Sequence, residues 1–369
     1  MHALVISPGA ADPASRGTLK AVAGLHWRVT AAVPHRWQAP GQPEPLVTAA
    51  GEDGGIRMVP VAVTSARRPG QAARWDVRAL RRLLTDVRPD LVHIDTEPTT
   101  DLAASVTATG KSLGIPVILA TWESLPRAYS FRPRRNRAKC LSRLTGVIAG
   151  TSLAADLLRA QYPALPSAVI PEAAVAIPPH VAPRSEGPLA IAFASRLVPE
   201  RGLDLLFLSC VKLPYQWTIT VMGTGPRQEP LERLAERLGI ASRVTWCGGL
   251  PRSARQDVWP RIDCVVVPSR RTSEWVETKT PILLEAMSHG VAAVVSDTGS
   301  LPEIVGDAGI VVPEGDVSLL AAALEHLAAR DVCAALGAAA RQRVIHNFAP
   351  TAIAKRLADQ WTQFIDGGR

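Results

Sequence analysis

Short apolar runs alternate with longer amphipathic stretches through the first half of the chain. The apolar runs have the length of buried strands and lie at Ala3–Ile6, Val29–Val33, Leu91–Ile94, Val117–Ala120 and Gly146–Ala149. Helix-like stretches separate several of them, for example Asp76–Thr85 and Ala103–Leu113. Because consecutive parallel strands need a crossover connection, usually a helix, this alternation predicts a parallel sheet with helices on both faces.

A proline-rich stretch, residues 170–188, interrupts this alternation. No strand or helix period runs through it, and its prolines are Pro171, Pro178, Pro179, Pro183 and Pro188. We therefore expect a linker or hinge here, between a first domain of residues 1–170 and a second domain of residues 171–349.

The alternation resumes after the linker, which predicts a second doubly wound α/β domain. Its strand candidates are Leu189–Ala194, Thr218–Met222, Val244–Trp246, Cys264–Val267, Ala292–Val295 and Ile310–Val312. Its helix candidates are Gly202–Cys210, Leu231–Leu238 and Leu319–Ala329. The last stretch, Thr351–Ile365, is a further amphipathic helix candidate, with Trp361 and Phe364 on one face.

Composition agrees with two globular domains. The chain has 369 residues, 47% of them hydrophobic and 20% charged, which excludes a disordered, collagen-like or coiled-coil protein. No apolar run approaches a membrane span, and Met1–Pro8 lacks the basic start of a signal peptide, so it is interpreted as a first strand. The absence of a C-x-x-C pair argues against a disulfide framework or a zinc site and favours a cytoplasmic protein; the five cysteines are Cys140, Cys210, Cys247, Cys264 and Cys333.

The net charge of +8 is unevenly distributed. Residues 1–170 hold 21 Lys and Arg against 12 Asp and Glu, so they carry +9, whereas the rest of the chain is close to neutral. A dense basic cluster in this half consists of Arg132, Arg134, Arg135, Arg137 and Lys139. The cluster is either a solvated face before the strand candidate Gly146–Ala149 or a contact for an anionic membrane surface or acceptor. Sequence-specific nucleic-acid binding is not expected, because no signature of a nucleic-acid-binding fold is present.

Several common chemical motifs are absent or incomplete. Gly110-Lys111-Ser112 has the end of a P-loop but follows a helix and lacks the earlier glycine. Asp95-Thr96-Glu97 is an acidic strand end that fits a hydrogen-bonded loop better than a metal site. The chain has no G-x-G-x-x-G, G-x-S-x-G or H-E-x-x-H, which argues against a nicotinamide enzyme, a serine hydrolase and a zincin.

Candidate site residues instead follow the strands of the second half, where ligands of doubly wound sheets bind. Arg196 and Arg201 follow the first of these strands, beside a helix start; they either bind a diphosphate or are two solvated surface arginines. Gly223 and Gly225 follow the next strand and either allow a ligand close to the backbone or form a plain turn.

The segment from Glu277 to Gly290 predicts a loop followed by a helix. Thr280 suits the N-cap, Pro281 the first helical position, and Gly290 the position after the helix. Glu277 then precedes the helix and Glu285 lies just over one turn inside it, which places both acids at the edge of the expected crevice.

These segments, taken together, resemble the retaining family 4 glycosyltransferases, also called glycosyl transferases group 1. The matching parts are Ala194–Asp204, Gly223–Pro226, Pro268-Ser269, Glu277–Glu285, Ser300–Val305 and Ala308–Val312, and more loosely Ile6–Pro8, Arg88–Asp90 and Glu97-Pro98. The resemblance implies the GT-B fold: two Rossmann-like, doubly wound parallel-sheet domains facing a cleft. It also implies a C-terminal helix, within residues 350–369, that crosses back to the first domain.

The resemblance implies a transferase that moves a sugar from a nucleotide-activated donor to a hydroxyl acceptor (a glycan, a lipid-linked sugar or a small molecule) without a metal or other cofactor. It assigns catalytic roles to Glu277, Arg196 and Arg201. Donor-binding roles fall to Glu285, Gly223, Gly225, Lys279, Thr280 and Ser269, with Glu285 on the ribose. Acceptor-side candidates in the first domain are Ser7, Glu97, Trp122 and Glu123. The expected location is cytoplasmic, with a peripheral position at the inner face of the membrane as an alternative.

The sequence departs from the family pattern at three places. Arg201 stands where the family usually has Lys, and Thr278, Lys279 and Thr280 replace a segment that ends in an aromatic residue and Gly. Pro281 cannot donate a backbone N–H to a phosphate. No histidine lies near Trp122 and Glu123, where the family often has one. Two alternatives therefore stay open: a non-catalytic nucleotide- or sugar-binding protein and a sugar-nucleotide epimerase.

Overall fold

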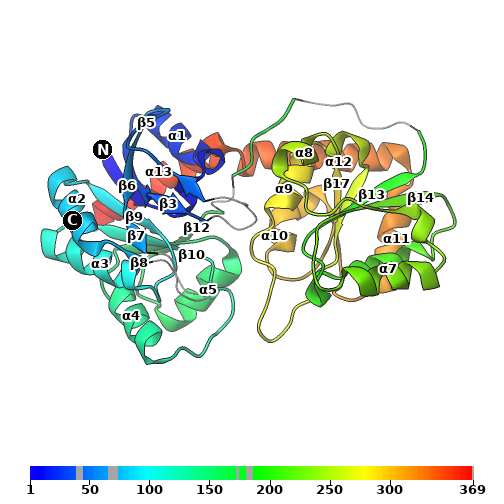
Figure 1. Ribbon diagram of the computed structural model, residues 1–369, viewed down its shortest axis with the longest axis horizontal. Helices are drawn as coiled ribbons and strands as arrows, with labels where there is room; N and C mark the ends of the chain where they lie inside the picture. The colour runs from blue at the N-terminus through cyan, green and yellow to red at the C-terminus, as the bar shows by residue number, and fades with distance from the viewer. Residues whose placement is uncertain (39–44, 65–73, 172–173, 180–185, 368–369) are drawn as a thin grey trace. The chain divides into compact units, whose positions relative to one another are not determined.

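The computed structural model describes residues 1–38, 45–64, 74–171, 174–179 and 186–367. The chain divides into two compact units (Figure 1). Unit 1 consists of Met1–Ala174 and Pro350–Arg369, and unit 2 of Val175–Ala349. Each unit is an α/β structure with its own sheet and its own hydrophobic core.

The main sheet of unit 1 has eight strands in the order β12-β11-β10-β9-β1-β2-β6-β5. All neighbours pair in parallel except β5, which is antiparallel to β6. The strands are β1 (His2–Ile6), β2 (Arg28–Pro34), β5 (Gly51–Asp53), β6 (Ile56–Val61), β9 (Leu91–Asp95), β10 (Val117–Thr121), β11 (Gly146–Ala149) and β12 (Ser167–Val169). Two small antiparallel pairs add β3 (Arg36–Trp37) with β4 (Leu46–Val47), and β7 (Val63–Thr64) with β8 (Arg74–Trp75).

Three helices of unit 1 begin at residues whose side chains satisfy free backbone N–H groups. Asp76 accepts from the N–H groups of the first turn of α2, and Thr100 and Thr151 do the same for α3 and α5. The helices are α1 (Gly17–Gly24), α2 (Val77–Val87), α3 (Asp101–Leu113), α4 (Phe131–Leu141), α5 (Ser152–Gln161) and α13 (Pro350–Gly367).

The C-terminal helix α13 belongs to unit 1, as the sequence predicts (Figure 1, red). Trp361 is fully buried and packs edge-on against Trp27, with ring centroids 5.2 Å apart. Phe364 lies so close to Gly146 that a Cβ there would approach its ring to 2.2 Å. The helix therefore completes the core on which β1 and β2 also pack.

The sheet of unit 2 has six parallel strands in the order β15-β14-β13-β16-β17-β18. They are β13 (Leu189–Ala194), β14 (Trp217–Met222), β15 (Val244–Trp246), β16 (Cys264–Val267), β17 (Ala292–Ser296) and β18 (Ile310–Val312). The helices are α6 (Leu203–Cys210), α7 (Gln228–Arg237), α8 (Arg252–Gln256), α9 (Pro281–Ser288), α10 (Leu301–Val305), α11 (Val317–Leu327) and α12 (Arg330–Asn347).

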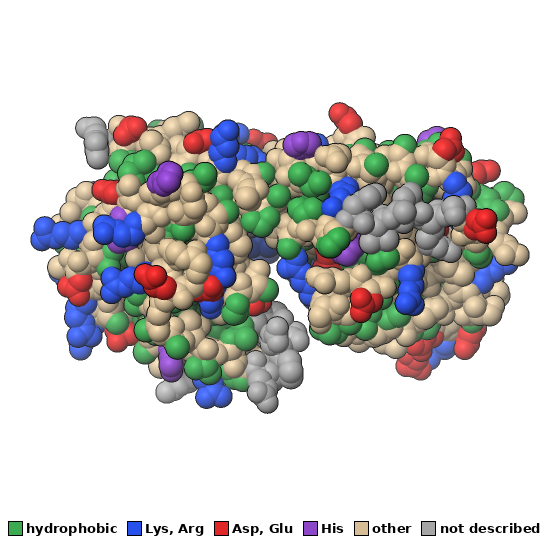
Figure 2. Space-filling model, turned by 90° about the horizontal axis from the view of Figure 1, so that it is seen from above, with side chains coloured by type: hydrophobic (Ala, Val, Ile, Leu, Met, Phe, Trp, Pro, Cys, Tyr) green, Lys and Arg blue, Asp and Glu red, His purple; other side chains and the backbone are tan. Residues whose placement is uncertain are grey.

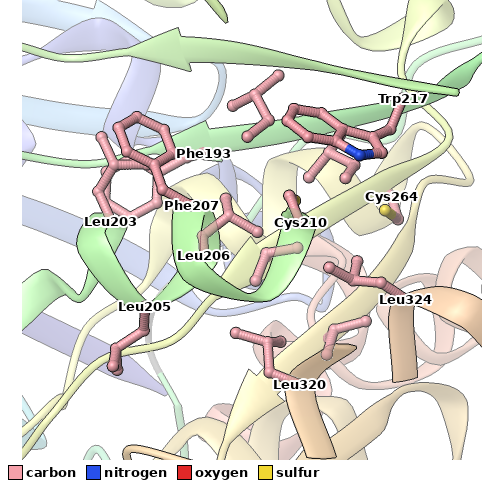
Figure 3. Packing of buried hydrophobic residues seen from close by; sticks show 14 of the residues in the cluster. Phe193, Leu203, Leu205, Leu206, Phe207, Cys210, Trp217, Cys264, Leu320 and Leu324 are labelled. Atoms are coloured by element: carbon pink, nitrogen blue, oxygen red, sulfur yellow. The ribbon is translucent and has the colours of Figure 1, made fainter. Parts of the chain in front are cut away.

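One face of this sheet packs against α6 and α11 (Figure 3). Phe193 and Trp217 extend from neighbouring strands toward Phe207 of α6, and Leu320 and Leu324 approach from α11. Every one of these side chains is buried, and roughly 2 kcal/mol of hydrophobic stabilisation accompanies the burial of each large one. The side chains of β13 are packed into this core, so the strand from which the following loop begins is held in place.

Two expectations need correction. Thr280 occupies the N-cap of α9, but its side chain accepts no N–H of the helix, and its hydroxyl has no partner among the described residues. The described residues of the expected linker, 170–171, 174–179 and 186–188, contain no helix or strand. Pro183 lies outside the described residues. The unit boundary at 174 falls a few residues after the expected one.

No helix in the described part of the chain combines the length and hydrophobicity needed to span a bilayer.

Candidate functional site

The centre of the unit 2 sheet is a topological switch point. From β13 the chain proceeds to β14 on one side, whereas β16 lies on the other side. Ligands of doubly wound sheets bind at such points, beyond the carboxyl ends of the strands. The loop after β13 and the loop after β16 touch there: Gly202 has a φ of +71°, and a Cβ at this position would lie 2.0 Å from the carbonyl oxygen of Pro268.

Three predicted site residues meet between these two loops. Arg201 donates from Nη1 to Glu277 Oε2, and Ser269 Oγ donates to the same oxygen at 3.0 Å. The Glu277 side chain is only 2% exposed and that of Arg201 is 15% exposed. A cation and an acid that the sequence placed separately at this edge of the sheet therefore form a nearly buried ion pair.

Burial and charge act in opposite directions on this pair. Burial raises the pKa of Glu277, while Arg201, the Ser269 hydroxyl and Arg196 oppose that shift. Burial also lowers the pKa of Arg201, and Glu277 opposes that shift. Arg196 is exposed and lies near enough to influence the pKa of both groups. All three predicted catalytic residues thus lie within electrostatic reach of one another.

An aromatic side chain covers the Arg201 guanidinium. The ring centroid of Trp275, in the loop after β16, is 4.7 Å from Arg201 Cζ. Arg201 Nε is buried and donates to no other described residue. A cation over an indole face is stabilised by the ring quadrupole, so Trp275 helps to hold the guanidinium in place. Sequence analysis did not identify Trp275, since a single aromatic residue in a loop carries no spacing signal.

The backbone of Glu277 is clamped by the loop after β17. Ser300 N donates to Glu277 O at 2.9 Å, and Ser300 Oγ donates to Thr278 O at 3.1 Å. Gly299 has a φ of +62°, and a Cβ there would lie 1.9 Å from Glu277 O. The clamp fixes the position of the carboxylate, and only glycine allows this approach.

Glu285 lies inside α9 and is 5% exposed. Arg255 of α8 holds its carboxylate with two bonds, Nε to Oε1 at 3.1 Å and Nη2 to Oε2 at 2.7 Å. Trp259 Nε1 donates to Oε1 at 2.9 Å. Neither partner was predicted, because residues 26 and 30 positions away are brought to α9 only by tertiary packing.

Both predicted glycines after β14 contact the loop after β13. A Cβ at Gly223 would lie 1.8 Å from Ser195 O, and one at Gly225 would lie 2.4 Å from Leu197 O. Leu197 N also donates to Thr224 O at 2.9 Å. The two loops therefore form one unit that carries Arg196 and Arg201, which explains both glycines on structural grounds. Lys279, in the Glu277 loop, is exposed.

Of the acceptor-side candidates, Ser7 and Glu97 follow β1 and β9 at the switch point of unit 1, whereas Trp122 and Glu123 follow the next strand, β10. Ser7 Oγ donates to Asp95 Oδ2 at 2.7 Å. Glu97 accepts from Thr121 Oγ1 at 2.6 Å and from the backbone N–H of Trp122 at 2.9 Å, so it fixes the turn after β10. The ring of Trp122 lies against Gly150, where a Cβ would approach it to 2.4 Å.

One residue of the predicted basic cluster, Arg137, is buried and pairs with Glu123, so the expected exposed cluster of five basic residues needs correction. Arg137 is 9% exposed and donates from Nε to Glu123 Oε2 at 3.3 Å, so it does not belong to an exposed basic surface. Arg132 pairs with Asp101 at the start of α3. Arg132, Arg134 and Arg135 are exposed and Lys139 is partly exposed, so these four remain as the accessible part of the cluster.

Comparison with known proteins identifies the family that the chain resembles in sequence and the fold that it shares with solved structures. The family profile described as "Glycosyl transferases group 1" matches residues 180–343, and the one described as "Glycosyl transferase 4-like domain" matches residues 9–173. The chain is similar to a GDP-mannose-dependent alpha-(1-6)-phosphatidylinositol monomannoside mannosyltransferase of Mycobacterium tuberculosis, with 32% identity over 173 residues, 45% of each chain. It is also 32% identical over 146 residues to a D-inositol 3-phosphate glycosyltransferase of Mycobacterium ulcerans, covering 37% of this chain and 30% of that protein. The matched segment thus spans less than half the length of these relatives.

Solved structures match over nearly the whole chain. Sucrose-phosphate synthase from Thermosynechococcus elongatus has a TM-score of 0.70 at 17% identity, covering 99% of both chains. Anabaena HepE in complex with UDP has a TM-score of 0.69 at 16% identity, covering 98% of this chain and 99% of that chain. This likeness, together with the two parallel sheets, confirms the predicted GT-B fold with its two Rossmann-like domains.

Proposed function

The chain belongs to the group 1 glycosyltransferases, and from that premise we propose that it moves a sugar from a nucleotide-activated donor to a hydroxyl acceptor. We propose further that the reaction retains the anomeric configuration and needs no metal. Relatives support a nucleotide-sugar donor: HepE has been crystallised with UDP-glucose, and the mycobacterial mannosyltransferase is named for GDP-mannose.

The nearly buried ion pair of Arg201 and Glu277 carries this proposal. Breaking a glycosidic bond to a diphosphate leaves negative charge on the departing phosphate and positive charge at the sugar. A fixed guanidinium stabilises the first charge and a fixed carboxylate the second, without reorganisation at the moment of reaction. Because Ser269 and the Ser300 clamp already hold Glu277, the acid is preorganised for the sugar hydroxyls and the reacting carbon.

The remaining donor contacts follow from the same loops. Arg196 supplies a second, exposed cation at the diphosphate, and Lys279 supplies charge where Pro281 has no N–H to donate. An ionised carboxylate has about four acceptor positions, and three bonds to Glu285 are accounted for, so one is left for a ribose hydroxyl. Gly223, Gly225 and Thr280 line the loops beside the nucleotide in this proposal.

Acceptor binding is assigned to unit 1, with Ser7, Glu97, Trp122 and Glu123 as candidates. A cytoplasmic location at the inner face of an anionic membrane forms part of the proposal, through Arg132, Arg134, Arg135 and Lys139. On the face in Figure 2, Lys and Arg side chains are dispersed among Asp and Glu.

A second candidate function is nucleotide binding without turnover. The observation that favours it is the replaced segment Thr278–Pro281, since Pro281 removes a phosphate donor at the start of α9. A sugar-nucleotide epimerase would use the same donor site but would need no acceptor.

The test is a panel of UDP-, GDP-, ADP- and TDP-sugars, with nucleotide release and thermal stabilisation measured for each. Release with one donor supports transfer and names that donor, and NMR of the product's anomeric proton then tests retention. Undiminished release after chelation with EDTA supports metal independence. Stabilisation by a nucleotide without release, with every acceptor tried, favours the binding protein, and epimerised donor without release favours the epimerase.

A further inference from the structure

Unit 1 contains a pocket of about 560 Å³, separate from the donor site of unit 2, whose lining includes the acceptor candidate Glu123. It lies between the loop after β10, α4 and the end of α5. Its charged and aromatic lining comes from Glu123, Arg127, Tyr129, Arg134, Arg137 and Tyr162. Pockets that bind small molecules have volumes of roughly 300–1,000 Å³, so the size fits a monosaccharide-sized ligand with a substituent.

The floor of the pocket is a fixed hydrogen-bond network. Glu123 accepts from Arg137 Nε and from the Tyr129 hydroxyl, and Arg137 Nη1 donates to the Tyr162 hydroxyl at 3.3 Å. Arg137 Cζ also lies 5.3 Å from the Tyr162 ring centroid. Burial and the neighbouring Glu123 raise the pKa of Tyr129, which keeps its hydroxyl a donor. Arg137 Nη2 donates to no other described residue, so the most buried cation of the pocket retains an unused donor.

The charge of the lining is positive. Glu123 balances Arg137, whereas Arg127 and Arg134 are exposed and form no ion pair with another described residue. The lining therefore carries an excess of two positive charges, which matches the charge of a phosphate monoester near neutral pH. The two tyrosine rings, with Ala128 and Ala138, offer apolar surface beside these cations.

We propose that this pocket binds a phosphoryl group attached to a hydroxylated ring, with Arg127 and Arg134 on the phosphate and the tyrosines beside the ring. Guanidinium forks bind phosphate oxygens in pairs, and flat aromatic faces accept the C–H face of a ring. The inference rests on the proposed function in one respect: the bound group is then the acceptor or part of it. The ligand is either a soluble sugar phosphate or the headgroup of a phosphorylated lipid.

Two neighbouring arginines of α4 provide a matched pair of variants. Arg134 lines the pocket and Arg135 does not, yet both are exposed and both removals lower the charge equally. Calorimetry on the full chain would titrate glucose 6-phosphate, glucose, and phosphatidylcholine vesicles with or without phosphatidylinositol phosphate. Stabilisation by the donor nucleotide, measured on the same samples, reports on unit 2 separately.

The proposal expects binding of glucose 6-phosphate, of the phosphoinositide vesicles, or of both, and none of glucose alone. For glucose 6-phosphate, Arg134→Ala should weaken binding roughly tenfold or more and Arg135→Ala less than about twofold, since one charged hydrogen bond contributes about 1.5–3 kcal/mol. Equal losses in both variants would mean diffuse surface charge and overturn the proposal. So would equal binding of glucose, or no binding of either phosphorylated probe. Such a failure with nucleotide binding intact leaves the proposed function standing, whereas loss of nucleotide binding as well removes both.

Discussion

Arg201 and Glu277 are 76 positions apart in the sequence and form one ion pair at the carboxyl end of the unit 2 sheet. The loop after β13 supplies the cation and the loop after β16 supplies the acid. Neither side chain forms a second ion pair with another described residue. The pair is therefore the point where the packing of two loops and the proposed chemistry depend on each other.

Replacing Arg201 with lysine tests whether its positive charge alone is needed or also the shape of the guanidinium group. Arg201→Lys keeps the positive charge but loses the planar fork and its stacking on Trp275, so we expect kcat/KM for donor cleavage to fall about 10- to 100-fold. Arg201→Ala should lower it by roughly 10²–10³. Nucleotide-release kinetics check both values. Equal activity of the lysine variant and the native chain would show that charge alone suffices.

Trp275 should act by holding Arg201. We expect Trp275→Leu to raise KM for the donor several-fold and to lower kcat, because a cation–π contact of about 0.5–2 kcal/mol is lost. Trp275→Phe keeps an aromatic face and should retain most of the activity. Steady-state kinetics of the two variants are the measurement. Identical effects of Leu and Phe would assign Trp275 a packing role only.

The glycine clamp on Glu277 can be tested with a paired control. Gly299 and Gly315 both have positive φ, but a Cβ at Gly299 would meet Glu277 O at 1.9 Å, whereas none of the described atoms lies within 4 Å at Gly315. Gly315→Ala should cost about 1–2 kcal/mol of stability and leave donor binding unchanged. Gly299→Ala should destabilise unit 2 further and weaken donor binding. Chemical denaturation and nucleotide titration measure both, and equal behaviour of the two variants contradicts the clamp.

Acid sensitivity is expected from His2 in the first strand. Burial, then Arg28, lowers the pKa of His2 from 6.5 to about 4, with Asp90 opposing. The unfolded chain therefore takes up a proton below pH 6.5 that the folded chain refuses until about pH 4. The stability that depends on neutral His2 is present above pH 6.5 and falls as the pH drops toward 4.

The His2→Gln variant measures this effect, because Gln can still donate to Thr30 but does not titrate. Between pH 7 and pH 5 the native chain should lose about 2 kcal/mol more unfolding free energy than the variant. Guanidinium denaturation of unit 1 at the two pH values is the measurement. His93 shifts in the same direction, so the variant should retain part of the slope. Equal slopes for both proteins would show that His2 is protonated in the fold.

Strands whose residues are nearly all buried could be predicted from the sequence, whereas some elements with many exposed residues could not. Gly146–Ala149, Leu189–Ala194 and Cys264–Val267 were predicted with the bounds that the structure has, because parallel strands with both faces largely buried form uninterrupted apolar runs in the sequence. The strand β6 was missed since Pro60 interrupts it and half of its side chains are not buried. The helix α4 was missed because its first seven residues include four arginines and a proline and show no apolar period.

The site divides in the same way. Arg201, Ser269 and Glu277 were found because each lies directly after a strand or before a helix, where the sheet topology brings them together. Arg255, Trp259, Trp275 and Gly299 were not found, since their roles depend on which loop lies opposite. The contact of Arg137 with Glu123 was missed for the same reason, and it removes one arginine from the predicted basic surface.

The most direct test of the account compares two acids of one loop. Glu277 is buried in the ion pair, whereas Glu274 is exposed three positions earlier, so Glu277→Gln and Glu274→Gln remove the same charge from the same loop. With the donor identified by the panel, nucleotide release should fall roughly 10²–10³-fold in Glu277→Gln and stay within about twofold of the native rate in Glu274→Gln. Native release from the Glu277→Gln variant, in a protein that unfolds at the native temperature, would contradict the assignment of this ion pair as the catalytic centre.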